Sequence, residues 1–524
     1  MKGDAEMMKY SKIPVCLLFI VILLYAFAAS AGGSKVMSEN KVPGQVESKA
    51  RRIMHDLRKA GFEVSRGYFK VWSPDDCAHT ISLLGSCLAN NPAAPYIASV
   101  VPPWPEEFVD PADSSVWGPS IEGYNDVYRF DPREAIVILG QLPPPAAYFS
   151  QQTYLFSRQG TFDTESDTYK KIYDNMPFLF PLLFEKLPYN TERFVSISSL
   201  SNSINNVVIE RQSGAAFNQI RYFIITPDQG MDKALREAFA HIGVEDLDIF
   251  TEQIPSDMQT GLEEEADDFT TAIRFAQPDI GQKVAAEKWR ANLPLVVLRV
   301  REKWSNRQPQ LYPPVVLEER IGVDEWPLQP DLGSLLYEVS RKWGQACTNA
   351  DCSDRAGSFR DMQTDPAKLV GPSCIPIGEN CLGDNWDTIY QFFGPMSLDN
   401  GEIYAITGTL GTETGNATYV GLGINQVSIL KGVANLSDEN LGGTANGYAA
   451  EVNNTDKFYL YYFTRDCSGL EDLTNSNCFE LPLTMIPQGD HFGISIRDYV
   501  KPGTQRGPDS DLVLPSKVLQ LERP

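Results

Sequence analysis

Histidine is scarce in this chain, which contains four among 524 residues. No two of them have a spacing typical of metal ligands. Several catalytic signatures are also missing, including G-x-S-x-G, H-E-x-x-H, the EF-hand loop and the P-loop. Gly421-Leu422-Gly423 lacks the third glycine and the following helix of a dinucleotide-binding turn. We therefore expect no metal site, and the sequence leaves any cofactor unknown.

Basic residues are in deficit. The chain has 45 Lys and Arg against 68 Asp and Glu, a formal net charge of -23 at pH 7. Nucleic acid and anionic membrane surfaces both require a basic face, so we expect neither as a partner. An acidic composition suits a soluble extracellular protein.

Long apolar runs are absent after the N-terminus. There, three lysines precede an almost continuous apolar stretch over residues 13–27, and small residues follow at 28–31. This pattern predicts a cleavable signal peptide over residues 1–30. The alternative is a membrane anchor, but the run is shorter than the about 20 residues that a span needs. We expect no stable membrane span after cleavage, and a location outside the cell or in an endomembrane lumen.

Cysteine spacing agrees with an oxidising compartment. Cys16 lies in the predicted signal, and eight of the nine cysteines remain. Eight cysteines permit 105 connectivities, of which we expect the set that joins sequence neighbours. The alternative, a zinc site built from the four central cysteines, requires tighter spacing. The expected pairs are Cys77–Cys87, Cys347–Cys352, Cys374–Cys381 and Cys467–Cys478.

Three sequons follow within a short stretch, at Asn416, Asn435 and Asn453. Behind a signal peptide they predict a glycoprotein, provided that the host glycosylates exported chains.

Hydrophobic periodicity predicts an α+β protein with several regions. Residues 31–215 form a mixed region of strands and loops. Residues 216–303 alternate as βαββαβ, which predicts a ferredoxin-like antiparallel sheet with two helices on one face. Residues 304–390 form a helical, disulfide-rich connector. Short strands over residues 391–524 predict a β-sandwich or jelly roll with a polar tail.

His491 is the strongest catalytic candidate. It lies between Asp490 and a predicted strand that ends before Asp498. An imidazole beside carboxylates can act as a general base near neutral pH. The alternative is that His491 only follows the turn formed by residues 487–490.

Two further groups are ligand-binding candidates. The adjacent residues Asp384, Asn385, Trp386 and Asp387 offer oxygen atoms for Ca²⁺ and an indole face for a sugar. The alternative is an acidic loop after a disulfide. Arg497 could bind an anionic group, or it could pair with Asp498.

The sequence leaves two functions open. One is a secreted enzyme acting on a small molecule or carbohydrate in a pocket between domains. The other is a non-catalytic protein that binds a ligand or forms extracellular structure.

Overall fold

The computed structural model describes residues 44–73, 75–110, 115–303, 307–364, 366–399 and 401–524. The expected signal peptide lies outside these ranges. Residues 40–524 form one compact unit. In the described ranges, no helix has the length and the apolar character needed to cross a membrane.

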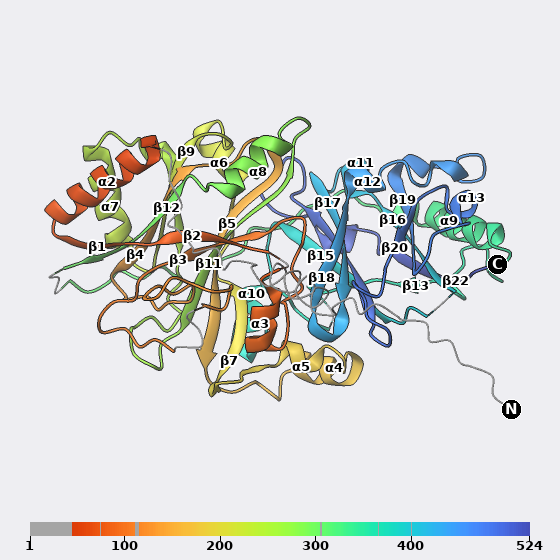
Figure 1. Cartoon of the computed structure of the whole chain (residues 1–524), viewed down its shortest axis with the longest axis horizontal. Coiled ribbons are helices and arrows are strands. Elements are labelled where there is room, and N and C mark those ends of the chain that lie inside the picture. The colour runs from red at the N-terminus through yellow and green to blue at the C-terminus, as the bar shows by residue number, and fades with distance from the viewer. Residues whose placement is uncertain (1–43, 74, 111–114, 304–306, 365, 400) are drawn as a thin grey trace, which may run out of the picture. The chain divides into compact units, whose positions relative to one another are not determined.

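Residues 44–303, which we call the N-terminal half, contain two sheets (Figure 1). Sheet 1 has the order β1 (Phe62–Arg66), β12 (Leu295–Glu302), β4 (Glu134–Gln141), β9 (Ile220–Thr226) and β10 (Ile249–Gln253). Sheet 2 has the order β2 (Tyr68–Trp72), β3 (Tyr96–Val100), β11 (Asp268–Pro278), β5 (Ala146–Gln159), β7 (Asn190–Ser199) and β6 (Lys186–Leu187), with β8 (Ile204–Asn205) paired to β5.

The rest of the chain, the C-terminal half, contains two more sheets. Sheet 3 has the order β13 (Gly357–Ser358), β22 (Lys517–Glu522), β16 (Glu402–Thr409), β19 (Phe458–Thr464) and β20 (Cys478–Glu480). Sheet 4 has the order β14 (Arg360–Asp361), β15 (Thr388–Met396), β21 (Phe492–Tyr499), β17 (Tyr419–Gln426) and β18 (Lys431–Ser437).

Each half encloses a hydrophobic core between its two sheets. Strand residues of sheets 1 and 2, such as Ile138 and Phe275, share one core. Residues of sheets 3 and 4, such as Ile406 and Ile494, share another. Two packed sheets agree with the coarse expectation for residues 391–524, and the jelly-roll topology stays a prediction.

Amphipathic helices cover the second face of sheets 1 and 3. In α7 (Gln229–His241), Met231, Leu235 and Phe239 recur every four residues and are buried against sheet 1 together with α2 (Gly44–Lys59). Asp228 caps α7 by accepting a hydrogen bond from Gly230 N. The helix α9 (Gln329–Lys342) covers sheet 3 in the same way (Figure 1). The remaining helices are α3 (Cys77–Leu84), α4 (Asp167–Asn175), α5 (Phe180–Leu183), α6 (Asn206–Ser213), α8 (Lys283–Ala291), α10 (Gly371–Cys374), α11 (Gly411–Thr414), α12 (Asp438–Leu441) and α13 (Glu471–Thr474).

The two halves repeat one topology. The strand orders β1-β12-β4-β9-β10 and β13-β22-β16-β19-β20 match when the strands are taken in chain order. In each of these sheets the last two strands, β9–β10 or β19–β20, are parallel, and a helix, α7 or α13, connects them along the chain. The orders β2-β3-β11-β5-β7 and β14-β15-β21-β17-β18 match likewise. The covering helices α2 and α9 both precede the first strand of their half.

The ferredoxin-like sheet expected over residues 216–303 is not present. Its first, second and fourth strands are β9, β10 and β12 of sheet 1, but the third, β11, lies in sheet 2 between β3 and β5. In addition, β9 and β10 are parallel. Periodicity identified these strands but could not assign them to sheets, because β11 is buried on both faces and its neighbours come from residues 96–159. Trp289 of α8 packs into the N-terminal core, whereas Val284 of the same helix is exposed.

The boundary expected between residues 215 and 216 falls inside both N-terminal sheets, because each contains strands from either side of it. The four predicted disulfides are confirmed. Their Cα–Cα distances are 5.4, 5.1, 5.9 and 6.0 Å in chain order.

Candidate functional site

A cavity lies between the outward faces of sheets 2 and 4. Its volume is about 70 Å³, counted as the space open to the centres of water molecules. A second cavity of about 20 Å³ adjoins it. Tyr96, Arg274, Leu382 and Gly383 line both. We call the larger space the C-chamber and the smaller one the N-chamber, after the half that supplies most of each lining.

Strand alternation explains which side chains reach this cavity. On β21, Arg497 lines the C-chamber, whereas Ile494 and Ile496 point into the core between sheets 3 and 4. On β11, Arg274 lines both chambers, whereas Ile273 points into the N-terminal core. Each half therefore places one arginine at the cavity.

Arg274 is 5% exposed. Its Nη2 donates to the carbonyl oxygen of Gly383 at 2.6 Å, and its guanidinium lies 5.2 Å from the ring centre of Tyr96 and 5.6 Å from that of Tyr154. In the part of the chain that the structure describes, Arg274 forms no ion pair, and its buried Nε has no hydrogen-bond partner. A guanidinium has five N–H donors, so most of its donors are unused by the protein.

Arg497 is likewise buried and uses few of its hydrogen-bond donors within the protein. It is 6% exposed, and its Nη2 donates to the carbonyl oxygen of Ala89 at 3.0 Å. Its guanidinium lies 5.9 Å from the ring centre of Tyr390. Among the described residues Nη1 has no partner. Nη1 lies against the backbone of Gly423, where a Cβ would approach it to 2.7 Å.

The repeated topology makes these two arginines equivalent. Strand pairing places Arg497 of β21 opposite Tyr390 of β15. The matching strands β11 and β3 pair Ala272 with Ala98, and the same register leads to Arg274 beside Tyr96. The site is thus built from one arginine and one tyrosine of each half.

The loops that accept from the arginines are also equivalent, and each docks on the other half. Each loop begins with the second cysteine of a disulfide, in the runs Cys87-Leu88-Ala89 and Cys381-Leu382-Gly383. In each, the tyrosine that packs on the arginine lies seven positions after the third residue of the run. Leu88 and Leu382 have left-handed φ angles of 56° and 53°. The amides of Cys87 and Ala89 donate to the C-terminal half, at residues 429 and 430, whereas those of residues 381 and 383 donate to the N-terminal half, at residues 196 and 197.

The charge balance at the cavity is positive. The carboxylate of Asp384 also lines the C-chamber, but it accepts hydrogen bonds from Ser199 N, Ser199 Oγ and Gly371 N. Burial raises the pKa of Asp384. Burial also raises the pKa values of Tyr390 and Tyr499, which keeps both phenols neutral. Two arginines therefore face one carboxylate, whose oxygens already accept hydrogen bonds from the protein.

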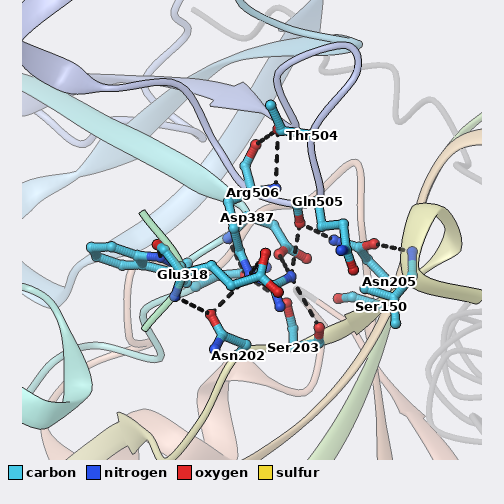
Figure 2. A network of polar contacts seen from close by, with 12 residues as sticks. Ser150, Asn202, Ser203, Asn205, Glu318, Asp387, Thr504, Gln505 and Arg506 are labelled. Atoms are coloured by element: carbon cyan, nitrogen blue, oxygen red, sulfur yellow. Dashed lines mark hydrogen bonds and ion pairs between the residues drawn. The ribbon is translucent and has the colours of Figure 1, made fainter. Parts of the chain in front are cut away.

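The rest of the loop predicted to bind a ligand holds the two halves together. Asp387 accepts from Tyr148 Oη at 3.0 Å and from Arg506 Nη1 at 3.3 Å. Figure 2 shows Arg506 between Asp387 of the C-terminal half and Asn202 and Ser203 of the N-terminal half. These contacts satisfy Asp387 within the protein.

Its two neighbours are also engaged. Asn385 is buried and donates to Tyr148 Oη, and Trp386 donates to the carbonyl oxygen of Glu318. The guanidinium of Arg320 lies 3.8 Å from the ring centre of Trp386. Of the five residues predicted to bind a ligand, Asp384 and Arg497 line the cavity.

The three catalytic candidates are not brought together. His491 is exposed just before β21 begins, and Asp490 accepts hydrogen bonds from Gln426 and Ser428. Asp498 is 3% exposed at the other end of the strand, on the face opposite to Arg497. None of the three lines either chamber, so the general-base hypothesis gains no geometric support and stays a prediction.

The sequons differ in exposure. Asn453 is exposed and Asn435 is half-buried. Asn416 is fully buried, and its Nδ2 donates to the carbonyl oxygen of Val323 and to Glu325. A glycan would be attached to that nitrogen, which is engaged within the protein at Asn416.

Sequence reasoning missed Arg274 and the tyrosines that line the cavity. A usable signal was present, since Cys-Leu-Ala and Cys-Leu-Gly each precede a tyrosine by the same number of residues. In the described ranges, no group of three or more acidic, histidine or cysteine side chains could hold a metal ion.

Comparison with known proteins gives limited information. No protein-family model and no curated protein matches the chain. Among solved structures, it is similar to a putative uncharacterized protein from Burkholderia cenocepacia, with 10% identity, a TM-score of 0.36 and coverage of 91% of this chain and 87% of that one. It is also similar to the VPA0106 protein from Vibrio parahaemolyticus, with 8% identity, a TM-score of 0.31 and coverage of 91% and 96%. The chain's own helices and strands make it a mixed α/β protein. The likeness to these two structures assigns it no function.

Proposed function

We propose that the protein binds a small organic anion in the cavity between its two halves. The observation that carries this proposal is the pair of buried arginines, Arg274 and Arg497, each with one protein acceptor. Two buried positive charges face one carboxylate at this cavity, which leaves an excess of buried positive charge. An anion that accepts from both guanidiniums would lower the cost of burying them.

The setting of the arginines supports an organic ligand. Three tyrosine rings at the cavity, those of Tyr96, Tyr390 and Tyr499, offer apolar and aromatic surface. A volume of about 70 Å³ is several times the space that one water molecule needs. The positive cavity also contrasts with the net charge of -23 of the whole chain.

We favour binding over catalysis as the primary role. The titratable groups at the C-chamber are arginines, neutral tyrosines and Asp384, whose oxygens already accept three hydrogen bonds. A general base needs a free lone pair within hydrogen-bond reach of the substrate. The enzyme expected from the sequence, acting on a small molecule or carbohydrate, stays the alternative.

Binding can be tested with purified full-length protein. Isothermal titration calorimetry would compare acetate, phenylacetate, phosphate and sulfate with the neutral analogue phenylacetamide. We expect at least one anion to bind and the amide to bind at least tenfold more weakly. Arg274→Met and Arg497→Met should each abolish binding, whereas Arg52→Met, on the exposed face of α2, should not. If no anion binds, or if both cavity variants bind as well as the native protein, the proposal is wrong.

We also propose that the protein is exported and glycosylated. The disulfides and the N-terminal apolar run support export. Expression of the full chain in a secretory eukaryotic host, followed by intact-mass measurement, tests both points. We expect removal of about 30 residues and a glycan that is lost in Asn453→Gln but not in Asn416→Gln.

A further inference from the structure

We propose that the natural ligand is an amphipathic acid whose anionic group lies between Arg274 and Arg497 and whose apolar arm fills the N-chamber. This inference rests on the proposed anion binding and adds the class of the ligand. It comes from comparing the two chambers position by position.

The repeated topology relates the chambers through three pairs of strand positions. Pairing of β11 with β3 and β5, and of β21 with β15 and β17, gives the same register in both halves. Ala98 of the N-chamber is equivalent to Phe392 of the C-chamber. In the same way Tyr154 is equivalent to Asn425, and Ala272 to Ser495.

At two of these positions the lining differs in polarity. The N-chamber has Ala272 where the C-chamber has Ser495, and an aromatic residue where the C-chamber has Asn425. The amide nitrogen of Asn425 donates within sheet 4, but its Oδ1 is buried and has no partner among the described residues. The Ser495 hydroxyl accepts from Asn425 and donates to the carbonyl oxygen of Gly423. The C-chamber therefore presents a free acceptor beside an engaged hydroxyl, a polar lining that suits a polar group.

The N-chamber is closed by aromatic and aliphatic side chains. Trp72 and Trp117 pack edge to face, with ring centres 5.2 Å apart, and their indole nitrogens donate to Thr80 and Thr270. The indoles therefore present apolar surface to the chamber. Tyr154 is the exception, because its buried hydroxyl has no partner in the described part of the chain. That hydroxyl could meet one polar atom of an otherwise apolar arm.

Arg274 lies where the chambers meet, since it lines both. An anionic group held there has the apolar chamber on one side and the polar chamber with Arg497 on the other. A carboxylate with a short apolar arm of one or two carbons satisfies this arrangement, because the volume of the N-chamber is only about 20 Å³. A polar substituent on the carbon next to the carboxylate would face the C-chamber, which Asn425 and Ser495 line.

The experiment compares ligands that differ in the arm alone. Calorimetric titration of the full chain with acetate, propionate and butyrate measures the contribution of the arm. Lactate, which adds a hydroxyl to propionate, measures the contribution of the C-chamber. We expect a longer arm to raise affinity over acetate at least threefold. We expect the hydroxyl to raise it a further threefold or more.

Filling the N-chamber provides the matched test. Ala272→Leu, or Ala98→Val if the first variant does not fold, should weaken propionate and butyrate at least threefold and change acetate less than twofold. The control Ala240→Leu lies on the exposed side of α7 and should change none of them. Equal affinities for acetate, propionate and butyrate, or propionate binding that resists both filling variants, would overturn the amphipathic assignment while leaving anion binding intact. If no anion binds at all, the proposed function fails instead.

Discussion

Gly423 offers a way to displace Arg497 without removing its charge. A Cβ at this position would lie 2.7 Å from Arg497 Nη1 and 2.8 Å from Ser495 Oγ. Ordinary contacts begin near 3.4 Å, so both side-chain ends must move by more than half an ångström. Gly423 lies within the regular strand β17, where alanine fits the backbone. Gly423→Ala should therefore move the guanidinium rather than unfold the protein.

The expected magnitude follows from the hydrogen bond that is lost. A bond to a charged group contributes about 1.5–3 kcal/mol, which corresponds to a loss of about 10- to 100-fold in anion affinity. The free energy of unfolding should rise by about 0.4–1 kcal/mol if the side chains adjust freely, because alanine restricts the unfolded chain. Calorimetric titration and urea unfolding of the same sample separate the two effects.

Gly421→Ala is the matched control. It lies on the same strand and face, opposite Arg497 in the register, but the polar atoms nearest to its Cβ would be Tyr419 Oη at 3.2 Å and Asn435 Oδ1 at 3.3 Å rather than the guanidinium. Its anion affinity should stay within threefold of the native value. Native affinity in Gly423→Ala, together with a normal unfolding curve, would refute the role given to Arg497.

Three other predictions concern stability and the loops at the cavity. Burial raises the pKa of Asp498 to about 8, above its value of about 3.9 in an unfolded chain, so its contribution to stability is present below pH 4 and is lost as the pH rises through 8. Asp498→Asn should therefore make the free energy of unfolding fall less between pH 5 and 8, as measured by urea unfolding. An unchanged dependence of that free energy on pH would contradict this. Arg299→Met leaves Glu107 and Glu134 buried without their shared partner and should destabilise the protein by about 3–5 kcal/mol in the same assay; a change below 1 kcal/mol would show that the two carboxyls are neutral without it. Replacing Cys374 and Cys381 by serine frees the loop that accepts from Arg274 and should weaken anion binding more than replacing Cys467 and Cys478, which lie outside the chambers; equal affinities in the two double variants would contradict it.

Local features of the fold were predictable from the sequence, because they depend on neighbours in the chain. The helices around Leu235 and Leu336 follow from apolar periodicity, and the four disulfides follow from spacing. The sheets were not predictable in this way. The strand containing Arg274 pairs with residues more than 100 positions away, and nothing in its own pattern identifies those partners.

The candidate site was predictable only in fragments. Asp384 and Arg497 were selected for their chemistry, and both line the cavity. Arg274 was not selected, because an arginine between apolar residues resembles an ordinary strand residue. His491 was selected because histidine is rare in the chain and because its neighbours are acidic. Neither property indicates where the end of a strand lies in the fold.

The exchange of loops between the halves has a consequence for symmetry. When the Cys87 loop docks on the second half and the Cys381 loop docks on the first through matching amide donors, the contact is isologous, as in a homodimer with a twofold axis. Equivalent residues of the two halves, Arg274 with Arg497 and Tyr96 with Tyr390, line the cavity. In a true homodimer both chambers would have to be identical, because one gene would encode them. Joining the two copies in one chain removes this restriction, so Ala272 and Ser495 can differ and a ligand without symmetry can bind in one orientation.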